Sequence, residues 1–297
     1  MRLPLHSVQQ ERKKGGRKRS LTLCALLLPL ALWSSFPCPA CAAELKRHTA
    51  EAFQRYVQQT EARMRGEIAD PAHFLYFDSL PENEKHAMLQ RLHSGHVIIE
   101  PMRTTENGRA IEMPDGLVHH WLAIGFMPGA TLEQALALAQ DYARQGQIYA
   151  PDVQRAEVLT HAGEHYSVYY RFYRQAIVSA VYNTELNVDY FLPDNSRAYC
   201  FTRSVRIAEV QNAGRENEKE LPVGHDHGYM WRLNLYTRYL EKDGGVYIQV
   251  EFLALSRSVP SIFAWLVNPY IRSIPREYLA HYLMTTRKAL APLPQAR

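Results

Sequence analysis

The chain contains little cysteine. Only 4 of its 297 residues are cysteines, and Cys24, Cys38 and Cys41 lie near the N-terminus, leaving Cys200 alone in the rest of the chain. A single thiol cannot form an intramolecular disulfide, so the remainder of the chain must be stabilised by a packed core. Because Cys200 lies in the strand-like sequence 198–201, we expect it to be a buried structural residue and not a nucleophile.

Motifs of the common catalytic and cofactor-binding sites are also absent. The sequence has no P-loop, no G-x-G-x-x-G turn and no G-x-S-x-G nucleophile elbow. No arrangement of Ser, His and Asp is specific enough to predict a triad. We therefore assign no catalytic residue, no cofactor and no metal, and we favour a binding protein over an enzyme.

Long hydrophobic runs are missing as well. Hydrophobic residues make up 46% of the chain and charged residues 22%, with a mean hydropathy of −0.33. This composition excludes a polytopic membrane protein and a wholly disordered chain. A globular protein of about 250 residues remains, which is long enough to bury a large core in one or two domains.

The basic residues are concentrated at the N-terminus. The formal net charge is +4, from 34 Lys and Arg against 30 Asp and Glu, and residues 1–43 hold seven of the basic side chains with one acid. The remaining 27 basic and 29 acidic side chains give a net charge of −2. Without a basic stripe in this part of the chain, we expect no nucleic-acid binding.

Residues 1–43 have the pattern of a secretory signal peptide. A basic run at 12–19 precedes thirteen largely apolar residues at 21–33, which are too few to span roughly 30 Å of hydrocarbon. Ala40 and Ala42 then have the A-x-A spacing of a signal-peptidase site. We expect cleavage near Ala42 or Ala43 and a periplasmic or secreted protein. An N-terminal membrane anchor that is not cleaved is the alternative.

The next region reads as helical. Residues 49–68 have mixed charges and few aromatic residues, and Pro81 opens a second helix that runs to 94 with acids in its first turn. A strand-like stretch follows at 96–100. We take 44–113 as an N-terminal helical extension.

The pattern changes to strands from Gly116. A strand over 117–127 precedes a helix that Thr131 begins through a capping box with Gln134. The last element is a helix with Pro275 in its first turn and an apolar stripe at helical spacing. Between these helices, turn residues separate strand-like runs at 155–160, 164–173, 177–191, 197–209, 228–240 and 245–256.

Alternation in these runs predicts a sheet with one apolar face. In 245–256, for example, apolar side chains alternate with Tyr247, Gln249 and Glu251. The same alternation puts His120 and Arg203 on the apolar side of their strands. The apolar face needs a cover, and the helix at 275–290 is available for it.

The order of these elements resembles the helix-grip fold of the START-like (SRPBCC) superfamily. Several segments of the chain are similar to elements of the coenzyme-Q-binding and polyketide cyclase-like branch. These elements are the first strand, a helix that carries an Asp-Tyr pair, a "Tyr-x-Pro-x-Val" link, the second strand and the closing helix. The similarity covers roughly 114–290, so we expect domains at 1–43, 44–113 and 114–297. The extension and an insertion at 211–226 depart from the minimal fold. The matching segments are 121–124, 128–131, Asp141-Tyr142, 148–153, 154–159 and 273–279.

The resemblance implies an α+β fold in which a curved antiparallel sheet of about seven strands wraps around a long C-terminal helix. It further implies a cavity between sheet and helix that holds a hydrophobic ligand such as a lipid, a quinone or a polyketide-like molecule. A cyclase-like or hydrolytic enzyme using His120, Arg203 and a cavity tyrosine is one alternative. A cell-envelope interaction protein with a filled core is another.

Polar residues on the apolar face are the candidate binding groups. A charge there is expensive unless it is paired, so Arg203 either finds an internal acid or meets a ligand head group. In the second case Arg203 and His120 would orient the polar end of the ligand. The residues expected to enclose its apolar tail are Tyr182, Leu186, Phe201, Trp231, Leu233, Ile248, Phe252, Leu279, Tyr282 and Leu283.

Other features have simpler interpretations. His225 and His227 share a face on an extended chain and could reach one metal, but a solvated turn is the favoured reading. The apolar segment from Ile262 to Ile271 packs in the core or forms a cavity gate that touches a membrane transiently. We expect most of the tyrosines to serve cross-strand packing.

Overall fold

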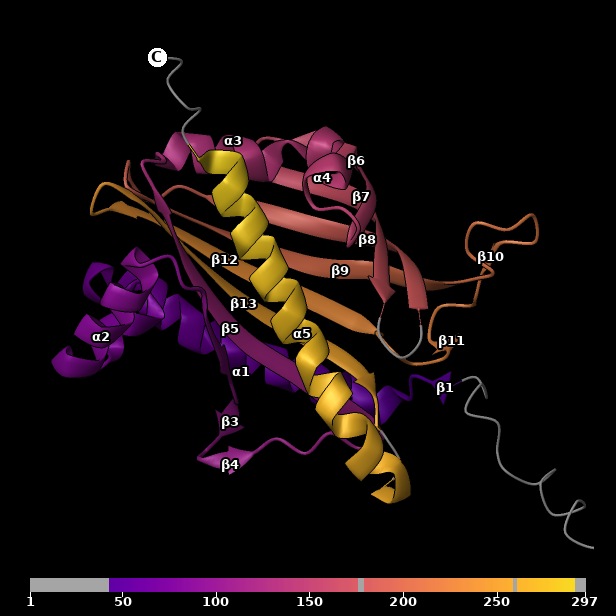
Figure 1. Ribbon diagram of the computed structural model, residues 1–297. Coiled ribbons are helices and arrows are strands. Elements are labelled where there is room, and N and C mark those ends of the chain that lie inside the picture. Colours follow the sequence, from indigo (N-terminus) through magenta and orange to yellow (C-terminus); the bar gives the residue numbers. More distant parts are fainter. Residues whose placement is uncertain (1–42, 176–178, 259–260, 292–297) are drawn as a thin grey trace, which may run out of the picture. The chain divides into compact units, whose positions relative to one another are not determined.

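An antiparallel sheet lies at the centre of the structure, a computed structural model that describes residues 43–175, 179–258 and 261–291. The predicted signal peptide therefore lies outside the described residues, except for Ala43. Within these ranges the sheet has nine strands, and β10 (Lys219–Glu220) pairs with one of them at the side. The other strands follow the order β2 (Ile98–Pro101), β5 (Gly116–Pro128), β13 (Gly245–Arg257), β12 (Arg232–Lys242), β9 (Arg197–Gln211), β8 (Ser179–Phe191), β7 (His165–Gln175) and β6 (Val153–Ala162) (Figure 1).

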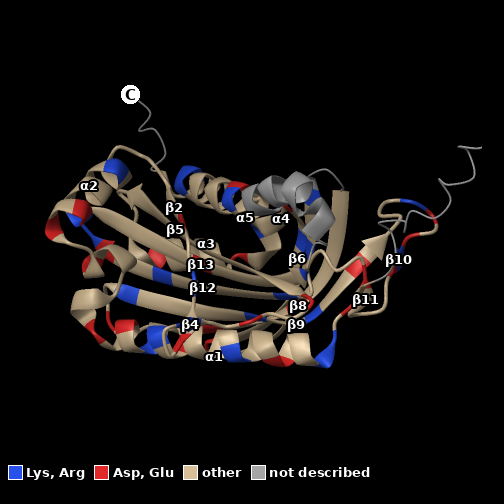
Figure 2. Cartoon of the chain, turned by 90° about the horizontal axis from the view of Figure 1, so that it is seen from below, with Lys and Arg blue, Asp and Glu red and all other residues tan. Residues whose placement is uncertain are grey.

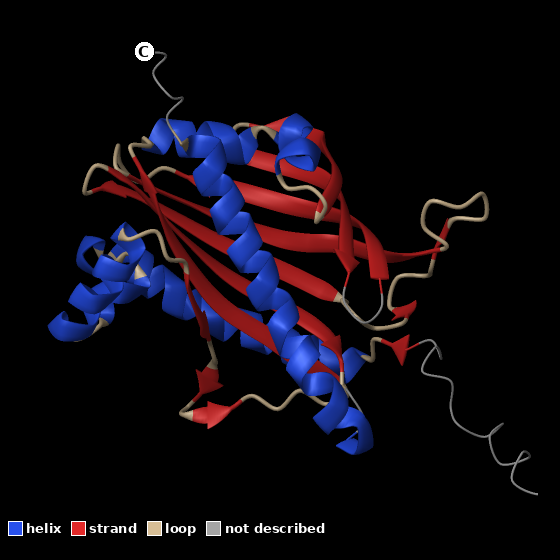
Figure 3. Cartoon of the chain, in the orientation of Figure 1, coloured by secondary structure: helices blue, strands red, loops and turns tan. Residues whose placement is uncertain are grey.

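Helices cover both faces of this sheet. The C-terminal helix α5 (Ser261–Leu290) lies across one face, which we call the inner face, and α1 (Arg47–Ala69) lies along the other, the outer face (Figure 2). No helix in the described ranges is both long and apolar enough to cross a bilayer. The remaining helices are η2 (Pro71–His73), η3 (Tyr76–Ser79), α2 (Glu82–His93), α3 (Leu132–Gln140) and α4 (Tyr142–Ile148) (Figure 3).

Local sequence explains how several elements begin and join. Thr131 caps α3 as expected: its hydroxyl accepts from the Gln134 amide at 3.2 Å, and the Gln134 side chain accepts from the Thr131 amide at 3.0 Å. Asp243 and Gly244 both have positive φ, of 58° and 75°, and form the two-residue turn between β12 and β13. An Asp-Gly pair suits such a turn because its backbone twist matches that of the flanking strands. The sheet and its closing helix confirm the helix-grip arrangement.

The inner face carries the largest core. Ala123, Leu186, Leu233, Ile248 and Leu283 are among its buried members, contributed by β5, β8, β12, β13 and α5. Burying a Leu or Ile side chain contributes roughly 1.5–3 kcal/mol. This core therefore secures α5 against the sheet.

The outer face has a core of its own. Phe53 and Met64 of α1 pack against Tyr236 and Leu253 of the sheet. Further along the same face, residues from η2 to α2 pack against Leu122 and its neighbours on β5. The region 44–113 thus covers the outer face with its helices and also contributes β2 to the sheet, and its boundary with the next domain at 113/114 stays a prediction.

Two short strand pairs complete the fold. Ala43–Glu44 (β1) pairs with His225–Asp226 (β11), so the chain next to the predicted cleavage site is held by the insertion at 211–226. The Leu45 amide extends this contact by donating to the Gly224 carbonyl at 2.8 Å. The other pair joins Thr105–Glu106 (β3) and Arg109–Ala110 (β4).

The C-terminal helix begins earlier than predicted. α5 runs from Ser261, so Pro275 lies inside it, and the segment Ile262 to Ile271 belongs to the helix. We expected the start at Pro275 because proline favours the first turn and removes a hydrogen bond inside a helix. The side chains of 261–273 lie outside the described residues, so the expected membrane contact stays a prediction.

A bulge in β9 changes the expected alternation. Glu185 and Leu186 are opposed by Arg206 and Ser204, which leaves Val205 as the extra residue. A bulge reverses the side on which the following side chains lie. Val205 is consequently 61% exposed, although strict alternation along 197–209 predicts that it shares the apolar side with Arg203.

Smaller differences concern two boundaries. The helix that begins after Thr131 is divided at Asp141 into α3 and α4. The strand expected from residue 228 begins at Arg232.

Candidate functional site

A cavity lies between the inner face of the sheet and α5. It offers about 90 Å³ to the centres of water molecules. One water needs roughly 10–15 Å³ by this measure, so the space holds several waters or a small part of a ligand. The lining comes from α3, α4, β6, β7, β8, β9, β12, β13 and α5, and from the α4–β6 link.

Tyrosine dominates this lining. The rings of Tyr149 and Tyr282 stack with their centroids 5.1 Å apart, which makes part of the wall a flat aromatic surface. Such rings combine an apolar face with a polar hydroxyl. The tyrosines that line the cavity are Tyr142, Tyr149, Tyr170, Tyr190, Tyr239, Tyr278 and Tyr282.

Several of their hydroxyl groups are hydrogen-bonded within the wall. The Tyr170 hydroxyl donates to Oε1 of Gln145 at 2.7 Å. Tyr142 and Tyr190 share a hydroxyl–hydroxyl contact of 3.1 Å. Burial raises the pKa of Tyr170 and Tyr190 well above the ordinary value of 10.0 and raises that of Tyr142 as well. These phenols are therefore neutral at physiological pH and can both donate and accept hydrogen bonds.

A charged cluster borders the cavity. Oδ2 of Asp152 lies 2.8 Å from Nδ1 of His281 on α5, and Oδ1 lies 3.1 Å from Nη1 of Arg174 on β7. Arg174 also donates to the carbonyl oxygen of Ile274 at 2.6 Å. Asp152 and His281 both line the cavity. The cluster ties α5 to the α4–β6 link and leaves Nε2 of His281 available for another partner.

The residues expected to enclose a ligand tail divide between the two faces. Leu186 and Tyr282 line the cavity itself. Phe201 and Trp231 belong instead to the core of the outer face. The members found in the inner core are Tyr182, Leu186, Leu233, Ile248, Phe252, Leu279 and Leu283, with Tyr282 packed against it.

His120 and Arg203 also lie on the outer face, away from the cavity. Nε of Arg203 lies 2.8 Å from Oε1 of Glu61 on α1, so the arginine has the internal acid that was one of its two expected partners. His120 contacts Tyr56 and Glu251. The alternation of apolar and polar residues placed both side chains on an apolar face of the sheet. It could not show that α1 covers this face and that α5 covers the other.

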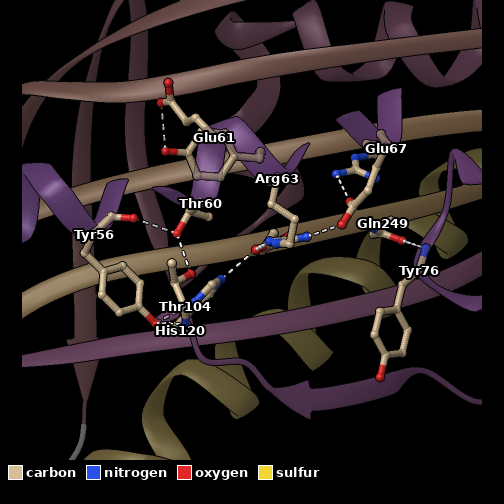
Figure 4. Close-up of polar contacts among 12 residues, drawn as sticks. Tyr56, Thr60, Glu61, Arg63, Glu67, Tyr76, Thr104, His120 and Gln249 are labelled. Atoms are coloured by element: carbon tan, nitrogen blue, oxygen red, sulfur yellow. Dashed lines mark hydrogen bonds and ion pairs between the residues drawn. The ribbon is translucent and has the colours of Figure 1, made fainter. Parts of the chain in front are cut away.

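His120 belongs to a buried polar network beneath α1 (Figure 4). Its Nε2 lies 2.6 Å from Oε1 of Glu251, and its Nδ1 lies 3.0 Å from the Tyr56 hydroxyl. A carboxylate can only accept, so Nε2 carries a proton, whereas the direction of the hydrogen bond between Nδ1 and the Tyr56 hydroxyl depends on the protonation of the ring. The Thr104 amide in turn donates to that hydroxyl at 2.8 Å. Arg63 completes the network through ion pairs with Glu251 and Glu67.

The histidines of the insertion serve separate contacts. His225 is exposed, whereas Nδ1 of His227 is hydrogen-bonded to Oε1 of Glu209. Asp226 between them is buried and accepts from the Gly228 amide at 2.6 Å. In the part of the chain that the structure describes, no group of three His, Cys, Asp or Glu is placed to hold a metal ion.

Apart from Tyr282, the tyrosine wall was not predicted from the sequence, and neither was the Asp152–His281 pair. A signal for the wall was present, because Tyr190 lies on the same side of β8 as the cavity-lining Leu186. The pair had no such signal, since its members are 129 residues apart in the chain. Only the packing of α5 brings them together.

Comparison with known proteins bears on the fold. No family model matches the sequence, and no curated protein does. Similar solved structures include the Zhui aromatase/cyclase from Streptomyces sp. R1128, with 9% identity and a TM-score of 0.42 over 59% of this chain and 94% of that one. Human STARD10 has 11% identity and a TM-score of 0.41, covering 71% and 80%. A STAR-related lipid transfer protein from Xanthomonas axonopodis has 15% identity and a TM-score of 0.35, covering 59% and 96%. All three similarities have TM-scores below 0.5, and they assign neither a family nor a function to this chain.

Proposed function

We propose that this protein binds a hydrophobic molecule in the cavity between the inner face and α5. The tyrosine wall is the observation that carries the proposal. A core filled only for stability favours aliphatic side chains without polar atoms, because each buried hydroxyl must find a partner. Here phenol groups surround an open space, which suits a ligand that combines apolar surface with a few oxygen atoms.

The stacked rings favour a particular class of ligand. Tyr149 and Tyr282 present aromatic faces, and Tyr170 stacks on Phe172 with centroids 5.0 Å apart. Planar rings pack well against such surfaces. A quinone or a cyclic polyketide-like molecule therefore fits the wall better than a plain acyl chain.

Entry of a whole ligand requires α5 to shift. The space of about 90 Å³ is smaller than a quinone or a lipid needs. The contacts of Asp152 with His281, and of Arg174 with the Ile274 carbonyl, hold α5 in its present position. We infer that these contacts open when the ligand enters.

Export is the second part of the proposal. It is supported by the basic, apolar and small-residue regions of 1–43. Fractionation of cells, followed by N-terminal sequencing of the mature protein, tests it. A mature chain starting near Ala42 or Ala43 is expected outside the cytoplasm, and an uncleaved chain in the membrane fraction would support the anchor.

Identification of the bound molecule tests the binding function. Native mass spectrometry of the purified protein should show an added mass, which is then identified after extraction. Val250→Phe adds volume to the cavity wall and should remove this mass. Val158→Phe makes the same change at a site that is 45% exposed on β6 and should leave it. Wild type without any bound molecule, or equal loss in both variants, would contradict the proposal.

The Asp152–His281 pair supports a second candidate function, an acid–base enzyme on the same cavity. Asp152 holds Nδ1, so Nε2 of His281 is free to transfer a proton to or from a bound molecule. In that case His281→Gln should retain the ligand identified above but stop its conversion. Chromatography of the products measures the conversion. Conversion by His281→Gln at the wild-type rate would exclude this role.

A further inference from the structure

A second pocket lies on the outer face, between α1 and the sheet. It offers about 180 Å³ to the centres of water molecules, twice the space of the tyrosine-lined cavity. No part of its lining is shared with that cavity. The residues that line it are Ala50, Phe53, Gln54, Val57, Glu61, Arg203, Ser204, Arg232 and Asn234.

Arg232 is the unusual member of this pocket. In the part of the chain that the structure describes, it forms no ion pair, and its one hydrogen bond runs from Nη1 to the carbonyl oxygen of Trp231 at 2.8 Å. The side chain is partly buried, and this burial lowers the pKa of the guanidinium from its ordinary value of 12.5. A partly buried cation without a counter-ion is destabilising. Arg232 therefore lowers the stability of the fold in these surroundings, and its guanidinium is suited to bind an anionic ligand.

The carboxylate in the wall of this pocket is already neutralised. Oε1 of Glu61 accepts from Nε of Arg203 at 2.8 Å and from the Tyr236 hydroxyl at 3.0 Å. Its Oε2 accepts from Arg65 at 3.3 Å. Two guanidinium groups thus share this one carboxylate, and no hydrogen bond joins it to Arg232. The pocket keeps a positive charge although Glu61 lies in its wall.

Neighbouring groups add further donors. The Ser204 hydroxyl oxygen accepts from the Leu233 amide at 3.0 Å, so its proton is free to donate to another acceptor. The Arg203 guanidinium uses Nε for Glu61, and its Nη1 forms an ion pair with Asp189 at 3.6 Å, a separation longer than a hydrogen bond. Donors from Arg203, Ser204 and Arg232 therefore line the same space.

We propose that this pocket binds a phosphate group, with Arg232 as its main ligand and Arg203 and Ser204 as supporting donors. Planar guanidinium groups recognise phosphate through paired hydrogen bonds. A single phosphate leaves part of the space unfilled, which admits a group attached to the anion. The site is independent of the apolar ligand on the inner face.

The free anion and a lipid headgroup share this chemistry, and the experiment separates them. Inorganic phosphate is titrated into the full mature protein at constant ionic strength, with binding followed by calorimetry and by the thermal midpoint. In a parallel arm, sedimentation is measured with vesicles of phosphatidylcholine alone or with added phosphatidic acid. Binding of inorganic phosphate identifies a soluble anion, whereas binding to the phosphatidic acid vesicles alone identifies a headgroup.

Matched variants decide whether the pocket is responsible. Arg232→Gln should bind the probe at least tenfold more weakly than wild type does. Arg155→Gln removes an exposed arginine on β6 that pairs with Glu157 and should leave the binding unchanged. Because Arg232 has no counter-ion among the described residues, Arg232→Gln should fold with unchanged or higher stability. Wild type that binds neither probe, or equal binding by wild type and Arg232→Gln, would overturn the proposal whatever the inner cavity holds.

Discussion

Nε2 of His120 lies 2.6 Å from Oε1 of Glu251, and the two side chains are only 2% and 1% exposed. The pair sits on the outer face, where α1 supplies Tyr56 to the histidine and Arg63 to the carboxylate. Groups from an N-terminal helix and from two strands thus satisfy one another in a region without access to water. Such a network is costly when one member is removed, because the partners remain buried without it.

We expect Glu251→Gln to lower the free energy of unfolding by about 3–5 kcal/mol. The change removes the charge that Arg63 and His120 face in a buried site. Urea denaturation at neutral pH measures the loss. Glu157→Gln, at an exposed ion pair with Arg155, is the control and should change stability by less than about 1 kcal/mol.

The same carboxylate should make stability depend on pH. Burial of Glu251 disfavours its charged form, but the hydrogen bond from His120 and the positive charges of Arg63 and Arg238 outweigh burial, so its pKa lies below the ordinary 4.5. A lowered folded-state pKa stabilises the protein above 4.5, and this stabilisation is lost as the pH falls through the folded-state value. The difference between wild type and Glu251→Gln should therefore shrink in acid. A constant difference down to the acid transition would contradict this assignment.

The thiol of Cys200 should not react in the folded protein. Burial raises its pKa from the ordinary 9.0 to about 11, so the thiolate is scarce at neutral pH. We expect an aromatic disulfide reagent to label Cys200 only after denaturation, at the rate of global unfolding. Rapid labelling of native protein would show instead that the cavity wall, to which Cys200 belongs, opens to solvent.

Much of the fold was predictable from local patterns. Alternation and turn residues located β8 and β13 to within a few residues, and Thr131 marked the start of α3. The pattern could not show which helix covers which face, because α1 and α5 both bury apolar side chains on the sheet. The predicted polar site therefore placed His120 and Arg203 beside a cavity that lies on the opposite face.

The site itself was less predictable than the fold. Tyr282 was expected to contact a ligand because it lies on the apolar stripe of the last helix, and it lines the cavity. The bulge at Val205 and the meeting of Asp152 with His281 depend on tertiary structure. A local pattern carries no information about residues that meet only through packing.

Gly245→Ala should destabilise the turn between β12 and β13. A Cβ atom at Gly245 would lie 2.4 Å from the Met127 carbonyl oxygen, which belongs to the neighbouring strand and cannot move away alone. We expect a loss of about 1–3 kcal/mol. In Gly66→Ala, by contrast, the new Cβ meets nothing within 4 Å inside α1, so helix propensity should keep or raise stability. Thermal unfolding of the two variants compares them directly, and an equal effect would contradict the close approach at Gly245.

Met64→Ala tests whether α1 is an integral part of the fold. Met64 is fully buried between α1 and the outer face, and its truncation should cost about 2–5 kcal/mol. Gln58 is exposed on the same helix, so Gln58→Ala should change stability by no more than about 0.5 kcal/mol. Urea unfolding should be followed by the fluorescence of Trp121, which packs against the inner core on the other side of the sheet, in a background where the other tryptophans are replaced by phenylalanine. If the outer cover and the sheet unfold as one unit, the Trp121 signal should shift to lower urea in Met64→Ala and not in Gln58→Ala. An unchanged Trp121 transition, with an early loss of helical circular dichroism, would show that α1 detaches from a sheet that is stable without it.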